Sequence, residues 1–70
     1  MNLASDKQIK FINSMRQVFS DYDELIGGEH QVPTATETWE MTKAQAGAYI
    51  SKSKEEFTKC WNMLLNSREQ

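Results

Sequence analysis

Three hydroxyl residues in this chain are each followed, three positions later, by Glu or Gln, and each pair leads into apolar residues. The pairs are Ser5 with Gln8, Thr42 with Gln45, and Ser53 with Glu56. In such a capping box the hydroxyl accepts a hydrogen bond from the third N–H of a helix, and the Glu or Gln side chain returns to the N–H of the cap residue. The sequence therefore predicts three helices and an all-α fold.

The first predicted helix covers residues 6–25, where apolar side chains recur every three or four positions and so share one helix face. This face is formed by Ile9, Ile12, Met15, Phe19 and Tyr22. Gly27 and Gly28 follow the helix, and glycine readily adopts the left-handed conformation that ends helices. We therefore expect the helix to stop just before this pair.

Two further helices are predicted, over residues 43–51 and 54–66. The last contains the clearest apolar stripe of the chain, formed by Phe57, Cys60, Trp61, Leu64 and Leu65. A break near residues 51–53 is favoured because the capping pair at Ser53 would have no role inside a continuous helix. The aromatic residues of this stripe are expected in the core.

The segment between the first two predicted helices, residues 27–41, is expected to be a long acidic connector. Pro33 disfavours a regular helix there. Residues 20–41 contain six carboxylates and no Lys or Arg. The predicted architecture is thus a small three-helix domain, spanning residues 1–70, with a long acidic connector between its first and second helices. Seventy residues are enough for only one such domain.

The cellular setting is predicted from what the sequence lacks. Cys60 is the only cysteine, so an intramolecular disulfide is excluded, whereas small secreted domains usually carry several. The N-terminal residues do not follow the basic-then-apolar order of a signal peptide. No apolar run is long enough to cross a bilayer. We expect a cytoplasmic protein that has no membrane contact.

Residues 4–12, ASDKQIKFI, resemble the opening of a small helical module, and residues 41–50, MTKAQAGAYI, are similar to its second half. The module typically reads Ala-Ser/Thr-x-Lys-Gln-x-x-Phe/Tyr-Ile, and later Leu-Thr-Lys-x-Glu/Gln-Ala-Ser/Gly-x-x-Ile. It occurs in bacteriophage and bacterial proteins, alone as a family of unknown function or attached to phage proteins of DNA recombination and replication. The resemblance implies a phage-type accessory protein linked to DNA metabolism, acting in the host cytoplasm if phage-encoded.

Catalytic and metal sites are not predicted. His30 and Cys60 are the only candidates for a base and a nucleophile, and no third residue is placed in the sequence to orient the histidine. One Cys and one His do not complete the four ligands of a structural zinc site. The acidic run from Asp21 lacks the glycine and glutamate positions of a calcium-binding EF-hand loop. We therefore predict a non-enzymatic protein without cofactor.

Binding of another protein is the first functional hypothesis. The acidic connector produces a negative field suited to a basic groove on a nucleic-acid-processing protein, which it would inhibit or modulate, and aromatic residues are favoured interface anchors. The predicted contact residues are Asp21, Tyr22, Asp23, Glu24, Glu29, Glu37, Trp39 and Glu40. For Trp39, packing on the core is favoured over exposure. The wide apolar arc of the last helix also suggests a homodimer.

Direct binding of DNA or RNA is the alternative hypothesis. Lysines near the helix starts would contact phosphates if the helices lie side by side, and such binding would weaken as salt rises. The predicted contact residues are Lys7, Lys10, Lys43, Lys52 and Lys54. The net charge of −2 makes this hypothesis second to protein binding.

Overall fold

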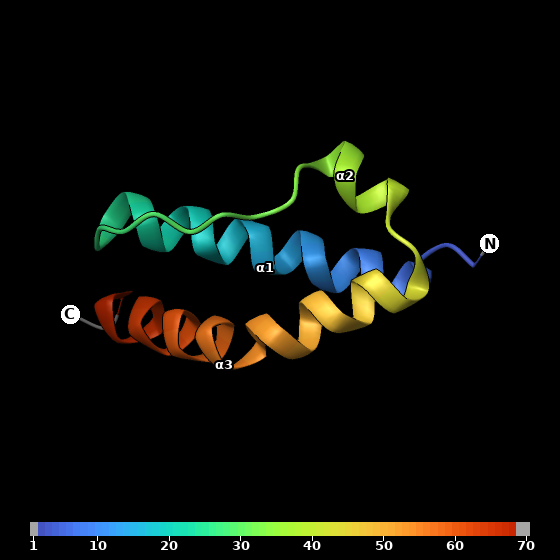
Figure 1. Ribbon diagram of the computed structural model, residues 1–70. Helices are drawn as coiled ribbons and strands as arrows, with labels where there is room; N and C mark the ends of the chain where they lie inside the picture. The colour runs from blue at the N-terminus through green and yellow to red at the C-terminus, as the bar shows by residue number, and fades with distance from the viewer. Residues whose placement is uncertain (1, 69–70) are drawn as a thin grey trace.

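The computed structural model describes residues 2–68, which form three helices (Figure 1). They are α1 (Asp6–Leu25), α2 (Ala35–Glu40) and α3 (Lys43–Arg68). The prediction of an all-α, three-helix fold is confirmed, and the described part of the chain has no strand beyond one antiparallel bridge between Leu3 and Thr42. None of these helices has an apolar window long enough to cross a membrane.

The two long helices, α1 and α3, run in the same direction and make most of the contacts between elements, because the connector and α2 return the chain along α1 (Figure 1). The short helix α2 packs on α1, near the end at which the chain begins. The molecule is correspondingly elongated, with principal extents of 46 × 17 × 17 Å. A helix pair with one small attachment leaves much of its surface uncovered, and this determines where binding sites can lie.

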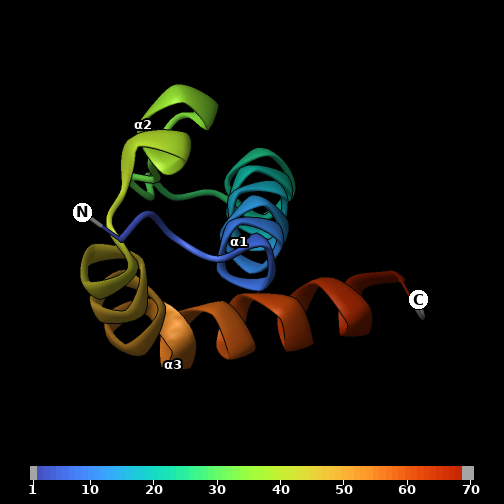
Figure 2. The same cartoon turned by 90° about the vertical axis from the view of Figure 1, so that its right-hand side faces the viewer.

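The predicted break between the later helices is wrong, because α3 is continuous through Ser53. No Gly or Pro lies between Ala48 and Arg68, so nothing in that stretch forces the helix to end. Figure 2 shows that α3 instead changes direction in its middle, near residues 50–55 by the colour bar of the picture. Serine residues, as at positions 51 and 53, are common where helices bend.

The predicted connector over residues 27–41 is also wrong in length, because α2 forms inside it. Thr34 caps α2 in a capping box: its Oγ1 accepts from the N–H of Glu37 at 3.1 Å, and its N–H donates to Glu37 Oε1 at 2.9 Å. Pro33 precedes the cap and therefore removes no helical hydrogen bond. Of the six carboxylates, only Glu29 lies in the irregular connector, residues 26–34, between α1 and α2.

The helix starts at Ser5 and Thr42 are confirmed as capping boxes. The N–H groups of Gln8 and Gln45 donate to the hydroxyls of these residues at 3.2 and 3.1 Å, and the Gln side chains accept in return. The predicted end of α1 is confirmed as well. Gly27 has a positive φ of 105° and its N–H donates to the carbonyl of Tyr22 at 3.2 Å.

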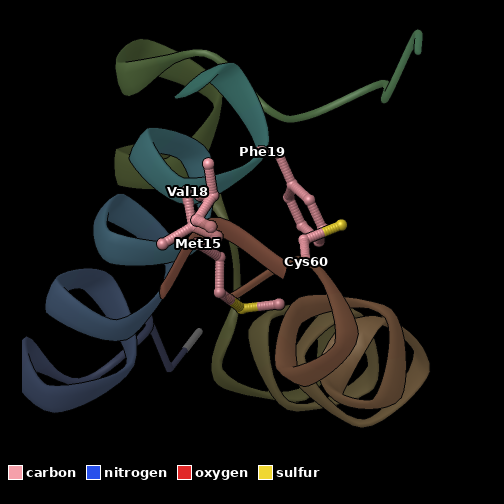
Figure 3. Close-up of a cluster of buried hydrophobic side chains, with 5 residues drawn as sticks. Met15, Val18, Phe19 and Cys60 are labelled. Atoms are coloured by element: carbon pink, nitrogen blue, oxygen red, sulfur yellow. The ribbon is translucent and has the colours of Figure 1, made fainter. Parts of the chain in front are cut away.

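The core lies between α1 and α3, and its central cluster is shown in Figure 3. The buried apolar residues are Ile9, Ile12, Met15, Val18, Phe19, Ala46, Cys60 and Leu64. Two expectations about tryptophan are wrong, since Trp61 is 44% exposed and Trp39 is 64% exposed. The single helix α1 does not cover the whole apolar arc of α3, and in the short α2 the one buried position is taken by Thr38.

Arg16 attaches the connector and α2 to α1. Its Nε donates to the carbonyl of Pro33 at 2.9 Å, and its Nη2 donates to Thr38 Oγ1 at 3.0 Å. The hydroxyl of Thr38 in turn donates to the carbonyl of Thr34 at 2.8 Å, so this buried polar group is fully bonded. We call these two Arg16 bonds the Arg16 contact.

Candidate functional site

Four chemically active side chains from three separate segments meet at the end of the molecule distant from α2. Asp23 lies in the last turn and a half of α1, His30 in the connector, and Glu56 and Cys60 four residues apart on α3. Gly27 and Gly28, with φ of 105° and 143°, reverse the chain and bring His30 back along α1. We call these four residues the His30 cluster.

Both ring nitrogens of His30 face a carboxylate. Nδ1 lies 2.5 Å from Asp23 Oδ1, and Nε2 lies 3.1 Å from Glu56 Oε1. The backbone N–H of His30 also donates to Asp23 Oδ2 at 2.9 Å. On the side of Nε2, Cys60 Sγ lies 3.8 Å from the ring nitrogen and 3.9 Å from Glu56 Oε1. The imidazole is thereby fixed from two sides.

Aromatic rings set the plane of the imidazole. The ring of His30 stacks on Phe19, with centroids 4.8 Å apart, and meets the edge of Tyr22 at 5.5 Å. Phe19 belongs to the buried core. The cluster therefore lies on the boundary between the core and solvent.

Hydrogen bonds shift the acidity of each charged member of the cluster. The hydrogen bond to Asp23 raises the pKa of His30 most, and the hydrogen bond to Glu56 raises it further. The backbone and ring N–H groups of His30 lower the pKa of Asp23, and the ring lowers the pKa of Glu56. Burial, followed by the charge of Glu56, raises the pKa of the Cys60 thiol. These shifts favour an imidazolium between two carboxylates, beside a neutral thiol.

The expectation that no third residue orients His30 is wrong, because Asp23 holds Nδ1 while Nε2 faces the thiol. This is the order of orienting acid, base and nucleophile in cysteine hydrolases. Two features disfavour that chemistry here. Cys60 is only 2% exposed, and its raised pKa leaves little of the nucleophilic thiolate at neutral pH. That the protein is not an enzyme stays a prediction.

Metal-ligand atoms of His30, Glu56 and Cys60 all lie within 4.8 Å of one another. In the sequence, only the single Cys and the single His stand out as ligands of a zinc site, and Glu56 fits a helix cap that begins at Ser53. Because Ser53 and Glu56 have the spacing of a capping box, the contact of Glu56 with the distant His30 was not predicted. A clue was present in the sequence, since Glu56 and Cys60 are four residues apart and share a helix face.

An apolar groove between α1 and α3 is the second feature with functional potential. It is lined by Ser14, Gln17, Val18, Asp21, Phe57 and Trp61, and we call it the Trp61 groove. The ring of Phe57 lies 5.5 Å from that of Phe11 and 6.5 Å from that of Trp61, between centroids. A row of three aromatic rings thus crosses from one helix to the other.

The predicted acidic contact residues do not form one surface. Asp21, Asp23 and Glu24 lie near the C-terminal end of α1, with Tyr22 half-buried among them. By contrast, Glu37, Trp39 and Glu40 lie on α2, toward the opposite end of α1 (Figure 1). Glu29 is exposed in the connector between them, Asp23 is engaged by His30, and Asp21 lines the Trp61 groove.

The predicted lysine contacts are distributed along the two long helices. Lys7 and Lys10 lie in the first turns of α1, Lys43 opens α3, and Lys52 and Lys54 lie at its middle. All five are exposed. Lys54 lines a shallow depression of mixed charge that also contains Glu55 and Lys59. Direct nucleic-acid binding through these residues stays a prediction.

Comparison with protein-family models, with characterised proteins and with solved structures finds no match. The similarity to the phage and bacterial module therefore stays a prediction, carried by residues 4–12 and 41–50.

Proposed function

We propose that this protein acts without catalysis, by binding another protein in the Trp61 groove. The observation that supports this most is the uncovered aromatic row. Phe11 is 37% exposed, and Trp61 is 44% exposed although it lines the groove together with the buried Val18. Aromatic side chains that keep a large exposed area beside a groove are typical anchors of protein interfaces. In this proposal these aromatic side chains are exposed because they contact the partner protein.

The polar rim of the groove defines the chemistry of the partner. Asp21 supplies a negative charge at the rim, and Ser14 and Gln17 supply hydrogen-bonding groups. An amphipathic helix fits such a site when its apolar face contacts the aromatic row and a Lys or Arg lies opposite Asp21. We therefore propose a partner segment that is apolar on one side and basic at its edge.

The nature of the partner protein follows from the module resemblance and from the acidic rim together. Nucleic-acid-processing proteins are rich in basic, partly apolar segments, so a phage-type accessory protein that occupies one would inhibit or modulate its owner. Under this proposal both proteins share the bacterial cytoplasm. The exposed Trp39 of α2, between Glu37 and Glu40, lies outside the Trp61 groove and is not part of the proposed contact.

A matched pair of tryptophan variants tests the groove. Trp61→Ala and Trp39→Ala each remove one exposed indole, from the groove and from α2 respectively. Each tagged protein is used to capture partners from bacterial lysate, and peptides that cover the basic segments of the captured protein are then titrated. We expect the wild type and Trp39→Ala to bind the same peptide, and Trp61→Ala to bind it at least about 30-fold more weakly, as for a hot-spot residue.

Other outcomes would replace the proposal. Equal peptide binding by Trp61→Ala and the wild type would exclude the groove. A dimer that Trp61→Ala dissociates in analytical ultracentrifugation would make a second copy the occupant. Retention of oligonucleotides that falls steeply with salt, and is lost on exchanging Lys7 and Lys10 for Gln, would support the nucleic-acid alternative.

A further inference from the structure

We propose that His30, Glu56 and Cys60 bind a zinc ion, with Asp23 as the residue that orients His30. The ligand atoms are His30 Nε2, a carboxylate oxygen of Glu56 and Cys60 Sγ. These three types of donor are the ones that zinc selects in proteins. The proposal concerns the end of the molecule away from α2 and does not depend on the Trp61 groove being a binding site.

The separations of the three atoms match those around a four-coordinate zinc ion. With bonds of about 2.0 to 2.1 Å to nitrogen and oxygen and about 2.3 Å to sulfur, tetrahedral angles place ligand atoms about 3.3 to 3.6 Å apart. The observed separations are 3.1 Å from Nε2 to Oε1, 3.8 Å from Nε2 to Sγ, and 3.9 Å from Sγ to Oε1. Each lies within about 0.4 Å of the tetrahedral value.

Asp23 gives the cluster the outer support that zinc-binding histidines normally have. Such a histidine donates its other ring N–H to a carboxylate or carbonyl, which fixes its tautomer and orientation. Asp23 Oδ1 lies 2.5 Å from Nδ1, and a second Asp23 oxygen accepts the backbone N–H of His30. Nε2 is thereby directed at the other two ligands. This arrangement is more specific than a chance group of polar side chains.

The cluster is open to solvent on the side of Glu56. The Glu56 side chain is 50% exposed, so water reaches the ion from that side. Cys60 is 2% exposed, and its sulfur points away from Met15 (Figure 3). Three protein ligands with a water molecule in the fourth position form the open type of zinc site, which catalytic zinc sites also use, whereas closed structural sites have four protein ligands.

Binding exchanges protons for the metal. The Cys60 thiol loses its proton to solvent and forms a zinc–sulfur bond. His30 loses the proton on Nε2 to solvent and keeps the one that Nδ1 donates to Asp23. Glu56 binds as the carboxylate it already is. The ion then joins the connector to α3, and because the unfolded chain does not assemble the three ligands, zinc stabilises the fold.

The test starts from the full chain after treatment with a chelator and its removal, and titrates Zn²⁺ alone. We expect one zinc per chain, and a melting temperature higher by about 10 °C or more when free zinc is 100-fold above its Kd. Substituted Co²⁺ should show thiolate-to-cobalt charge-transfer absorption and the strong visible bands of a four-coordinate ion. Mg²⁺, which prefers oxygen ligands, should not compete.

Four variants separate the roles of the residues. Cys60→Ser should abolish the charge-transfer band, and Glu56→Gln, at a half-exposed position that tolerates the change, should weaken zinc binding. Asp23→Asn should weaken it by about 10- to 100-fold while keeping the cobalt spectrum, as for a positioning residue. Glu55→Gln removes a charge from the neighbouring, exposed position and should change nothing.

The proposal fails if the folded wild type binds no zinc at micromolar concentrations. It fails equally if Glu56→Gln, shown folded by circular dichroism, binds zinc as tightly as Glu55→Gln, or if Co²⁺ gives no sulfur charge-transfer band. Trp61→Ala should retain zinc binding in full. A loss of partner binding and a loss of metal binding are therefore distinguishable.

Discussion

The connector is held to the helices at two places, and the two differ in chemistry. At the Arg16 contact a permanent cation donates to a backbone carbonyl and a hydroxyl, which do not titrate near neutral pH. In the His30 cluster an imidazole lies between two carboxylates and beside a thiol, all of which exchange protons or bind metals. The first is a structural attachment, whereas the second responds to its surroundings.

The largest effect is expected from removal of the Arg16 contact. Arg16→Met keeps the aliphatic stem but leaves the Pro33 carbonyl and Thr38 Oγ1 without their charged donor. We expect a loss of about 2 kcal/mol in the free energy of unfolding, since hydrogen bonds to charged groups contribute about 1.5 to 3 kcal/mol. Urea denaturation measures it, with Lys10→Met as an exposed control. A loss below about 0.5 kcal/mol would show that α2 is held by other contacts.

A second substitution tests whether the chain reversal positions the His30 cluster. Gly28 has a φ of 143°, and a Cβ there would lie 3.1 Å from Asp23 Oδ1, whereas a Cβ at Gly27 would meet nothing within 4 Å. Both Gly→Ala changes strain the backbone by about 1 kcal/mol or more. Only Gly28→Ala should also displace Asp23 and shift the ring resonances of His30 in NMR spectra. Identical spectra for the two variants would contradict this.

The capping pairs at Ser5 and Ser53 provide a third comparison. The expected loss of stability is about as large as that of a Gly→Ala change at Ser5 and close to zero at Ser53. Ser5→Ala removes the hydroxyl that accepts from Gln8 and should cost about 1 kcal/mol in thermal or chemical unfolding. Ser53→Ala, inside α3, should change stability by no more than about 0.5 kcal/mol and favours the helix by propensity. Equal losses would indicate that Ser53 caps a helix after all.

The smallest effect is expected from pH, measured in the presence of a chelator. The raised pKa of His30 gives stability that is complete below its ordinary value of 6.5 and is lost as pH rises through the folded value. The lowered pKa values of Asp23 and Glu56 give stability that is complete above the ordinary value of 4.5 for Glu and is lost as pH falls through the folded values. Stability from the cluster should therefore be greatest between these ordinary values, 4.5 and 6.5.

His30→Gln is the control for the pH measurement. It should flatten the decline between pH 6.5 and the alkaline range in which Cys60 begins to ionise, while Arg16→Met should keep the decline. Solvent around the half-exposed Glu56 screens these interactions, which keeps the effect small. An unchanged slope in His30→Gln would assign the pH dependence to other groups.

The features that the sequence predicted well are those encoded within a few residues. The caps at Ser5 and Thr42 and the buried Ile12 and Met15 follow from spacing along one helix, so periodicity was sufficient to find them. The same spacing is misleading at Ser53, because Glu56 contacts the distant His30 and does not cap a helix. At Thr34 and Glu37 the same pattern does form a cap, although the neighbouring Pro33 favoured irregular structure in the prediction.

The candidate sites were harder to predict because they depend on how distant segments meet. Asp23 and His30 are brought together by the positive φ angles of the two glycines, and the path of the connector past α3 adds Glu56 and Cys60. The exposure of Trp61 depends on how much of α3 a single neighbouring helix covers. Neither the direction of a connector nor the coverage of a helix face is readable from residue spacing alone.

The bridge between Leu3 and Thr42 has a practical consequence for handling the protein. The N–H groups of Ala4 and Lys43 donate to the carbonyls of Met41 and Asn2 at 3.0 and 2.8 Å, so the beginning of the described chain is fixed beside the start of α3. An affinity handle or fluorophore attached ahead of it emerges near α2, remote from the His30 cluster (Figure 1). Immobilisation through that end would leave the opposite end open to titrants.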